Sequence, residues 1–189
     1  MDDTLSTTKI LSPADAEFFC RDGWKAADLH AHTLYSADVI PAPSLRPQAL
    51  YQVAINNGMD FVTFTDHDTM ASYQVSALSG EGLVRGAEIK IKDIEAVGHT
   101  IHVNVYELDN YQFKELERIA GQGYIYQFLD FLKEEDLPFV YNHPLWFESG
   151  EKPNYAAIPD LIRLFPVVEY NMHRVRRENE LVVEFALNH

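Results

Sequence analysis

Residues 26–38 read AADLHAHTLYSAD and contain the feature on which the fold assignment depends. A strand-like segment ends there in His30 and His32, two positions apart. Because side chains alternate between the two faces of a strand, both imidazoles fall on one face, in the geometry with which proteins hold a metal ion. Asp38 follows within reach of the next loop. A pair of surface histidines on an edge strand would give the same local pattern, so the assignment depends on partners elsewhere in the chain.

A second group of polar residues, TDHD at positions 65–68, directly follows the strand-like run at residues 61–64. Several ionisable groups at the end of a buried strand are costly unless they are paired or bind a cation. This cost favours a functional role for His67. Asp68, together with Thr69, is expected to cap the helix that follows.

Glu88 and His143 also interrupt or end strand-like runs. Glu88 is a carboxylate within residues 83–91, and the alternative to a functional role is a solvent-facing glutamate paired with Lys90, its neighbour on the same face. His143 ends the run at residues 139–142, and Pro144 prevents the strand from continuing. A polar residue at a strand exit is again typical of a site.

His99 and His102 lie on one predicted strand but on opposite faces, because they are three residues apart. The apolar side chains of Ile101, Val103 and Val105 form the face that packs against helices. His102 lies on the other face, toward a barrel interior. Parity therefore selects His102 as a ligand and excludes His99.

The composition of the 189 residues is that of one globular domain with a full core, at 47% hydrophobic and 12% aromatic. Fifteen basic and 29 acidic residues give a net charge of −14, which makes bulk nucleic-acid binding unlikely. The single cysteine, Cys20, excludes a disulfide framework and a cysteine zinc cluster. The acidic start and the lack of a long apolar stretch predict neither a signal peptide nor a membrane span, hence a cytoplasmic protein.

Alternating strands and helices predict an α/β fold with parallel strands and helical crossovers. A short helix is expected to begin at Ser12 and end near Gly23, within an N-terminal extension over residues 1–23, and the main domain spans residues 24–189. The predicted strands cover residues 26–33, 60–66, 83–91, 99–106, 138–142 and 166–171, and the predicted helices cover residues 44–57, 112–119, 124–135, 155–164 and 176–188. Six strands are too few for an ordinary eight-stranded barrel, and the last helix leads to no further strand. We therefore expect a barrel that is cut short.

Five strand ends or interiors thus carry His, Asp or Glu, and a shared metal site explains them more simply than five separate accidents. Nitrogen and oxygen ligands without thiolate suit Zn²⁺, Mn²⁺ or Fe²⁺.

The motifs resemble, in order along the chain, those of the polymerase and histidinol phosphatase (PHP) family of metal-dependent phosphoesterases. Residues 28–38 closely resemble the first motif and residues 65–67 the second. Residues 86–89 followed by 100–103 resemble the third, and residues 142–144 the fourth. The resemblance implies a distorted seven-stranded β/α (TIM-like) barrel with two or three divalent metal ions.

The resemblance also implies a distribution of ligands among the ions. One ion would be held by His30, His32 and Glu88, and Glu88 would bridge to a second ion completed by His102 and His143. Asp38 and His67 would hold a third, and Glu88, His67 and Asp66 are the catalytic candidates. The family usually ends with an Asp-x-His strand that also supplies ligands. No such motif occurs near the C-terminal end of this sequence, so we expect weak or no activity from this chain.

The chemistry that such a cluster supports is phosphoester hydrolysis. Adjacent divalent ions lower the pKa of a bridging water to give hydroxide, and they neutralise charge on the phosphoryl oxygens. Arg174, Arg176 and Arg177 are candidates for binding the phosphate of a small substrate such as a nucleotide or sugar phosphate. Pairing of these arginines with neighbouring glutamates is the alternative. His173 beside them is not expected to be a ligand.

Two other functions remain open at this point. An amidohydrolase-like metal hydrolase also begins with His-x-His on a first barrel strand, although Glu88 and the Tyr-Ser-x-Asp continuation disfavour it. A metal-binding scaffold or regulatory module without catalysis is the second alternative.

Overall fold

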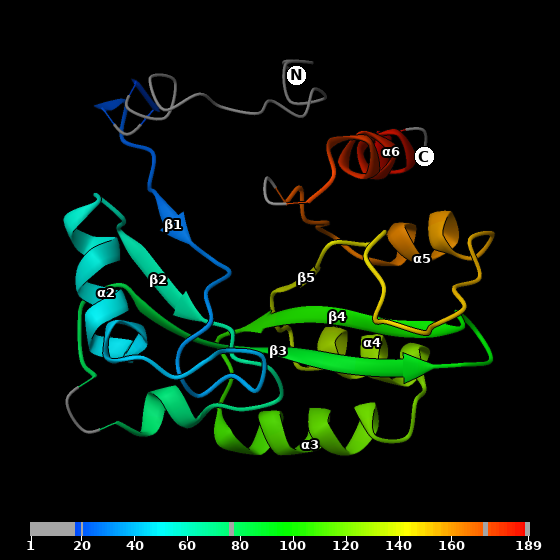
Figure 1. Cartoon of the computed structure of the whole chain (residues 1–189), viewed down its shortest axis with the longest axis horizontal. Helices are drawn as coiled ribbons and strands as arrows, with labels where there is room; N and C mark the ends of the chain where they lie inside the picture. The colour runs from blue at the N-terminus through cyan, green and yellow to red at the C-terminus, as the bar shows by residue number, and fades with distance from the viewer. Residues whose placement is uncertain (1–17, 20, 76–77, 172–173, 188–189) are drawn as a thin grey trace.

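The computed structural model describes residues 18–19, 21–75, 78–171 and 174–187, and within them the chain has a mixed α/β fold. The sheet is a curled half-barrel whose five strands follow one another in chain order (Figure 1). They are β1 (Ala27–Asp28), β2 (Phe61–Phe64), β3 (Leu83–Asp93), β4 (His99–Tyr106) and β5 (Phe139–Tyr141). The helix expected from Ser12 falls mainly on residues outside this description.

The expectation of an all-parallel sheet is wrong for its second half. β1, β2 and β3 run parallel, but β4 is antiparallel to both β3 and β5. Only residues 94–98 join β3 to β4. A parallel crossover needs a dozen or more residues, so this short link permits only a hairpin.

The strands at both edges are shorter than predicted. β1 has two residues, and the extended segment that follows it carries His30 and His32. The predicted strand at residues 166–171 is reduced to one parallel bridge between Val168 and Tyr141. The described residues therefore form five of the seven strands that the resemblance implies.

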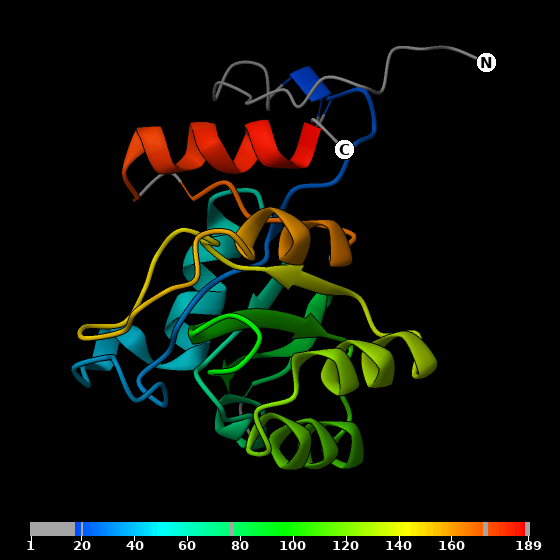
Figure 2. The same ribbon diagram turned by 90° about the vertical axis from the view of Figure 1, so that its right-hand side faces the viewer.

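Five α-helices accompany the sheet in the described part of the chain. They are α2 (Pro47–Asn56), α3 (Asn110–Ala120), α4 (Ile125–Glu134), α5 (Ile158–Leu164) and α6 (Arg176–Leu187). In Figure 1, α3 lies below β3 and β4 and α4 lies behind them, whereas α5 and α6 lie above, past β5 (Figures 1 and 2). No helix among the described residues has the length and apolar character needed to span a bilayer.

Local sequence signals explain where these helices begin. Pro47 stands at the first position of α2, where its missing N–H costs nothing. It also separates α2 from a 3₁₀ turn at Pro43–Leu45, so the single helix predicted over residues 44–57 is two elements. Asp109 and Gln112 form a capping box at the start of α3, each side chain bonding to the other's backbone N–H.

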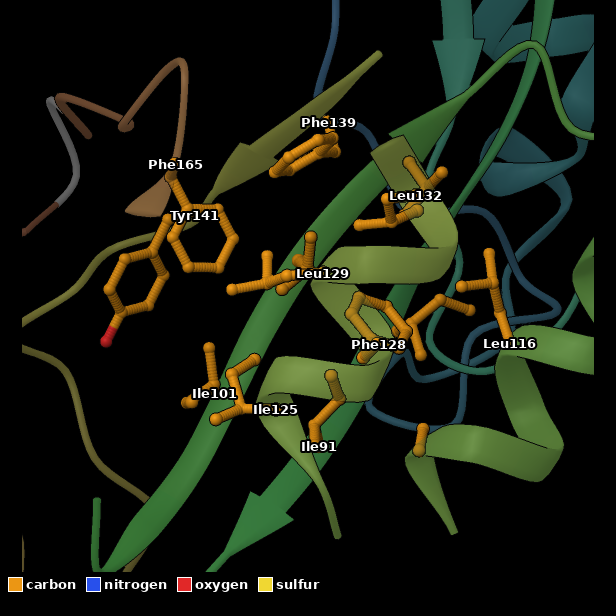
Figure 3. Packing of buried hydrophobic residues seen from close by; sticks show 14 of the residues in the cluster. Ile91, Ile101, Leu116, Ile125, Phe128, Leu129, Leu132, Phe139, Tyr141 and Phe165 are labelled. Carbon is orange, nitrogen blue, oxygen red and sulfur yellow. The ribbon is translucent and has the colours of Figure 1, made fainter. Parts of the chain in front are cut away.

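The main core lies between β3 and β4 and the helices α3 and α4 (Figure 3). Alternate residues of the two strands, among them Ile91 and Ile101, face Phe128, Leu129 and Leu132 of α4 in this core. Burying each such side chain contributes roughly 1.5–3 kcal/mol. The opposite faces of β3 and β4 are left to polar side chains, and these form the site described below.

The predicted capping role of Asp68 is wrong. Asp68 has a left-handed backbone conformation, with φ of 49°, and its carboxylate accepts the Lys90 backbone N–H at 2.9 Å. Thr69 accepts the backbone N–H of Ala71 at 3.2 Å, and the segment that follows is a short 3₁₀ turn. Asp68 thus fastens the loop after β2 to strand β3.

Candidate metal centre

Glu88, fully buried on β3, is the centre of the histidine cluster. Its Oε2 lies 3.1 Å from His30 Nε2 and 2.8 Å from His32 Nε2. Its Oε1 lies 3.0 Å from His102 Nδ1 and 3.3 Å from His143 Nε2. One carboxylate therefore joins histidines from both edges of the half-barrel.

Strand register explains how β3 and β4 aim these groups. Glu88 pairs with Asn104, and Lys90 pairs with His102, so all four side chains lie on the face opposite the apolar core. Asn142 adds a hydrogen bond from Nδ2 to Glu88 Oε1 at 2.9 Å. The alternative of a solvent-facing Glu88 paired with Lys90 is wrong, since Lys90 Nζ lies 3.5 Å from Asp68 instead.

His99, on the same strand as His102, lies outside the cluster. Its Nδ1 lies 2.9 Å from the carbonyl oxygen of Val97, and its ring packs edge-on against Phe147 at a centroid distance of 4.8 Å. The parity argument thus placed both histidines correctly.

The loop after His32 adds Asp38 to the cluster. Asp38 Oδ1 lies 3.2 Å from His32 Nδ1 and accepts a hydrogen bond from Ser36 Oγ at 2.6 Å. Ser36 Oγ in turn accepts the backbone N–H of His67 at 3.0 Å. His67 Nε2 lies 3.8 Å from Asp38 Oδ2, and its Nδ1 lies 3.6 Å from Glu88 Oε2.

The same side chains form three groups of possible metal ligands, each with ligand atoms within 4.8 Å of one another: His30, Glu88 and His143; His32, Asp38 and His67; and His67, Glu88 and His102. This partition differs from the one that the PHP resemblance implies, because His32 joins Asp38 and His143 joins His30. The donor set fits a divalent ion such as Zn²⁺, Mn²⁺ or Fe²⁺. Among the described residues, two buried ring nitrogens of the cluster, His67 Nδ1 and His102 Nε2, have no hydrogen-bond partner, as does His99 Nε2 outside it; the first two are available to an ion.

The pKa values of the clustered histidines are shifted in different directions. Burial lowers the pKa of His67 to about 4. Burial also opposes protonation of His30, but hydrogen bonds to Glu169 and Glu88 raise its pKa to about 10. The pKa of Glu88 is far below its usual value because four histidines contact it, although burial acts in the other direction. The carboxylate is therefore ionised and available as a ligand.

The cluster opens into a cavity of about 380 Å³. Besides the histidines, Asp38 and Glu88, it is lined by Ala37, Lys90, Trp146, Glu148, Asn171 and Arg174. The Trp146 ring lies 5.2 Å from both the His102 and the His143 rings, edge to face. The Arg174 guanidinium lies over the ring of this tryptophan, 4.8 Å from the ring centroid. The cavity is thus lined by possible metal ligands and by two cationic side chains, Lys90 and Arg174.

The three candidate arginines have different surroundings. Arg174 alone among them lines the cavity. Arg176 is 87% exposed and forms an ion pair with Glu180 at 2.8 Å. Arg177 is exposed on α6. His173 lies outside the described residues.

The structure does not bring Asp66 into the cavity. Thr33 donates both its backbone N–H and its hydroxyl group to the fully buried Asp66 carboxylate, the latter at 2.8 Å. Burial raises the pKa of Asp66, against these two hydrogen bonds. Asp66 therefore holds the segment that carries His32, and its predicted catalytic role does not fit this placement.

Sequence reasoning missed several residues around the site, Glu169 above all. Glu169 Oε1 lies 2.7 Å from His30 Nδ1, and Trp146 and Glu148 line the cavity. The only signal for Glu169 was its place as a carboxylate in a strand-like run, and this pattern is common in surface strands.

No model of a known protein family and no curated protein matches the sequence. Solved structures with a similar fold include a protein described as a metal-dependent phosphoesterase from Bifidobacterium adolescentis, with a TM-score of 0.57 and 16% identity, covering 87% of this chain and 84% of that one. An amidohydrolase from Chromobacterium violaceum, solved with sulfate and no metal, gives a TM-score of 0.55 and 14% identity, with coverage of 85% and 82%. PsfC from Pseudomonas syringae gives a TM-score of 0.58 and 17% identity, with coverage of 87% and 71%. At these identities the likeness shows a shared fold.

Proposed function

We propose that this protein is a metal-dependent phosphoesterase that hydrolyses a small phosphate ester with water. The observation that carries the proposal is the buried Glu88 carboxylate, with histidine nitrogens within 3.3 Å of both of its oxygens. A single carboxylate that faces two sets of nitrogen ligands is suited to bridging two divalent ions. The description of one structural neighbour as a metal-dependent phosphoesterase supports the same reaction.

The residues divide into those that would hold ions and those that would hold substrate. His30, Glu88 and His143 would hold one ion, and His67 would complete a second set with either His32 and Asp38 or Glu88 and His102. When bound, such ions supply Lewis-acid activation of water and neutralise charge on the phosphoryl group.

The side chains at the cavity wall would bind and orient the substrate. Arg174, held against Trp146, offers a planar guanidinium that matches phosphate oxygens, and Lys90 adds a second positive charge. His67 is buried and has a lowered pKa, so at neutral pH it is uncharged and its free ring nitrogen is available to an ion. The volume of the cavity suits a small phosphorylated molecule.

The decisive experiment compares metals, substrates and two matched variants. The chain is stripped with a chelator, reloaded with Zn²⁺, Mn²⁺ or Fe²⁺, and assayed with p-nitrophenyl phosphate and with p-nitroacetanilide. We expect weak but metal-dependent release of p-nitrophenol that is abolished in His102→Gln. His99→Gln removes a histidine of the same strand that lies outside the cluster, and it should keep the activity.

Two results would overturn the proposal. Cleavage of the anilide alone would identify an amidohydrolase, the description of another structural neighbour. Stoichiometric metal uptake without turnover of either substrate would favour a metal-binding scaffold.

A further inference from the structure

Glu169 contacts both histidines of one ligand group, although it does not line the cavity. Its Oε1 lies 2.7 Å from His30 Nδ1, on the side of the ring opposite to Nε2, which faces Glu88. Its Oε2 accepts the backbone N–H of His143 at 3.0 Å and a hydrogen bond from Asn171 Nδ2 at 3.2 Å. Both oxygens are therefore already engaged behind the cluster.

We propose that Glu169 is a positioning residue for the metal centre: it fixes His30 with Nδ1–H donated to the carboxylate and Nε2 presented to an ion. The inference rests on the proposed function, because it assumes that His30, Glu88 and His143 hold a metal. A carboxylate behind the distal nitrogen of a histidine ligand sets the tautomer and orientation of the ring and raises its basicity.

The backbone around Glu169 is built to hold the carboxylate in this place. Glu169 donates its backbone N–H to the carbonyl oxygen of Tyr141 at 2.9 Å, next to the bridge between Tyr141 and Val168. This contact ties the segment to the end of β5, two residues before His143.

The second contact of Glu169 stabilises an unusual backbone conformation. His143 has φ of 30°, which non-glycine residues adopt only at an energetic cost. The Glu169 carboxylate accepts the N–H of this residue, so it supports the conformation that directs the His143 ring toward Glu88. One carboxylate thus orients two ligands that are more than a hundred residues apart in the chain.

The test measures Zn²⁺ affinity and stoichiometry by competition with a chromophoric chelator in the wild type, Glu169→Ala and Glu169→Gln. We expect Glu169→Ala to weaken the site that contains His30 by roughly ten- to a hundred-fold. The group His32, Asp38 and His67 should keep its ion. Glu169→Gln should fall between, because its amide oxygen can still accept from His30 while its NH₂ opposes the N–H of His143.

A spectroscopic readout and a control variant separate positioning from a loss of folding. In the zinc-loaded wild type, nitrogen-15 NMR should show a protected proton on His30 Nδ1, and this signal should be lost in Glu169→Ala. Glu148→Gln removes the charge of a carboxylate that lines the cavity 3.7 Å from His102, and it should leave the His30 signal unchanged.

The two proposals fail in different ways. Wild-type affinity and an intact His30 signal in Glu169→Ala would overturn the positioning role alone. An equal loss of every bound ion in that variant would also overturn it, since it would show a general structural effect. A wild-type chain that takes up no divalent ion would overturn the metal centre itself.

Discussion

Replacing Glu88 with glutamine is the sharpest perturbation of this molecule. Glu88 is fully buried, so its carboxylate is surrounded by other side chains. Each of its oxygens faces two histidine nitrogens within 3.3 Å. Glutamine turns one of these oxygens into an NH₂ group. It also removes the negative charge that, together with Glu169, raises the pKa of His30.

The size of the effect follows from this geometry. Removing one partner of a buried, hydrogen-bonded charge pair costs about 3–5 kcal/mol. A domain of this length loses roughly 2–4 °C in Tm per kcal/mol. We therefore expect the metal-free Glu88→Gln protein to melt roughly 6–20 °C below the metal-free wild type.

Metal adds a second, independent readout. An ion present at about a hundred times its Kd stabilises a folded protein by about 2.7 kcal/mol, which is roughly 5–11 °C on the same scale. The wild type should show this rise in Tm on addition of Zn²⁺. Glu88→Gln should show a clearly smaller rise, because the ligand shared by two of the three groups is gone and only the group His32, Asp38 and His67 is left complete.

The assay is thermal unfolding followed by circular dichroism, with chelator and then with Zn²⁺. Glu151→Gln is the control, since the Glu151 side chain is only 4% exposed, accepts two hydrogen bonds from Thr100 and does not itself line the cavity. It should lose stability but keep the rise in Tm with metal. A Glu88→Gln protein that melts within about 2 °C of the wild type and gains as much stability from Zn²⁺ as the wild type would refute the reasoning.

Two further predictions concern single side chains. Arg174→Ala should lower kcat/KM for a phosphate ester by roughly ten- to a hundred-fold with unchanged metal content, because one charge-assisted contact is lost; Arg176→Ala, whose side chain is already paired with Glu180, should stay within about twofold. Equal kcat/KM values in the two variants would show that Arg174 does not bind the substrate phosphate. Hydrogen bonds from Thr100 hold the pKa of Glu151 below its ordinary value of 4.5, although burial opposes this. The stability advantage of wild type over Glu151→Gln is therefore fully present above that value and is lost as the pH falls through the lower folded pKa. Urea unfolding between pH 7 and pH 3.5 measures this difference, and a decline that already begins between pH 7 and pH 6 would contradict it.

The fold could be predicted wherever the hydrophobic pattern was strong. The alternation in residues 99–106 predicted β4 with its observed bounds. The direction of that strand was predicted wrongly because the alternating order of elements was given more weight than the length of the link from β3. β1 is shorter than predicted because its continuation is held by side chains: Asn104 and Tyr106 both donate to the carbonyl oxygen of Leu29, in place of ladder hydrogen bonds.

Within the site, parity was the most informative rule, and it also explains the error at Asp66. The rule separated His102 from His99 because the apolar face of β4 was visible in the sequence. The same rule places Asp66 and His67 on opposite sides of the chain, and His67 alone is bridged to Glu88. Asp66 was assigned to the site because it is charged and adjacent, whereas its carboxylate binds Thr33.

Glu169 shows what a sequence pattern cannot supply. It lies 139 positions from His30, on a segment with a single bridge to the sheet. A lone carboxylate in a strand-like run has no periodic partner that would reveal its role. Only the closure of the chain around Glu88 brings it behind the imidazole.

The grouping of ligands also limits how many ions the described side chains hold well. His67 belongs to two of the three groups, with His32 and Asp38 and with Glu88 and His102. A neutral imidazole has one lone pair, so His67 completes one of these groups at a time. Glu88 has two oxygens and is not limited in this way. Two ions can therefore have three protein ligands each, one of them at His30, Glu88 and His143, which is enough for a site that leaves a position open to water. A third ion would have only two ligands from these groups. They are Glu88 and His102 if His67 binds with His32 and Asp38, and His32 and Asp38 if it binds with Glu88 and His102.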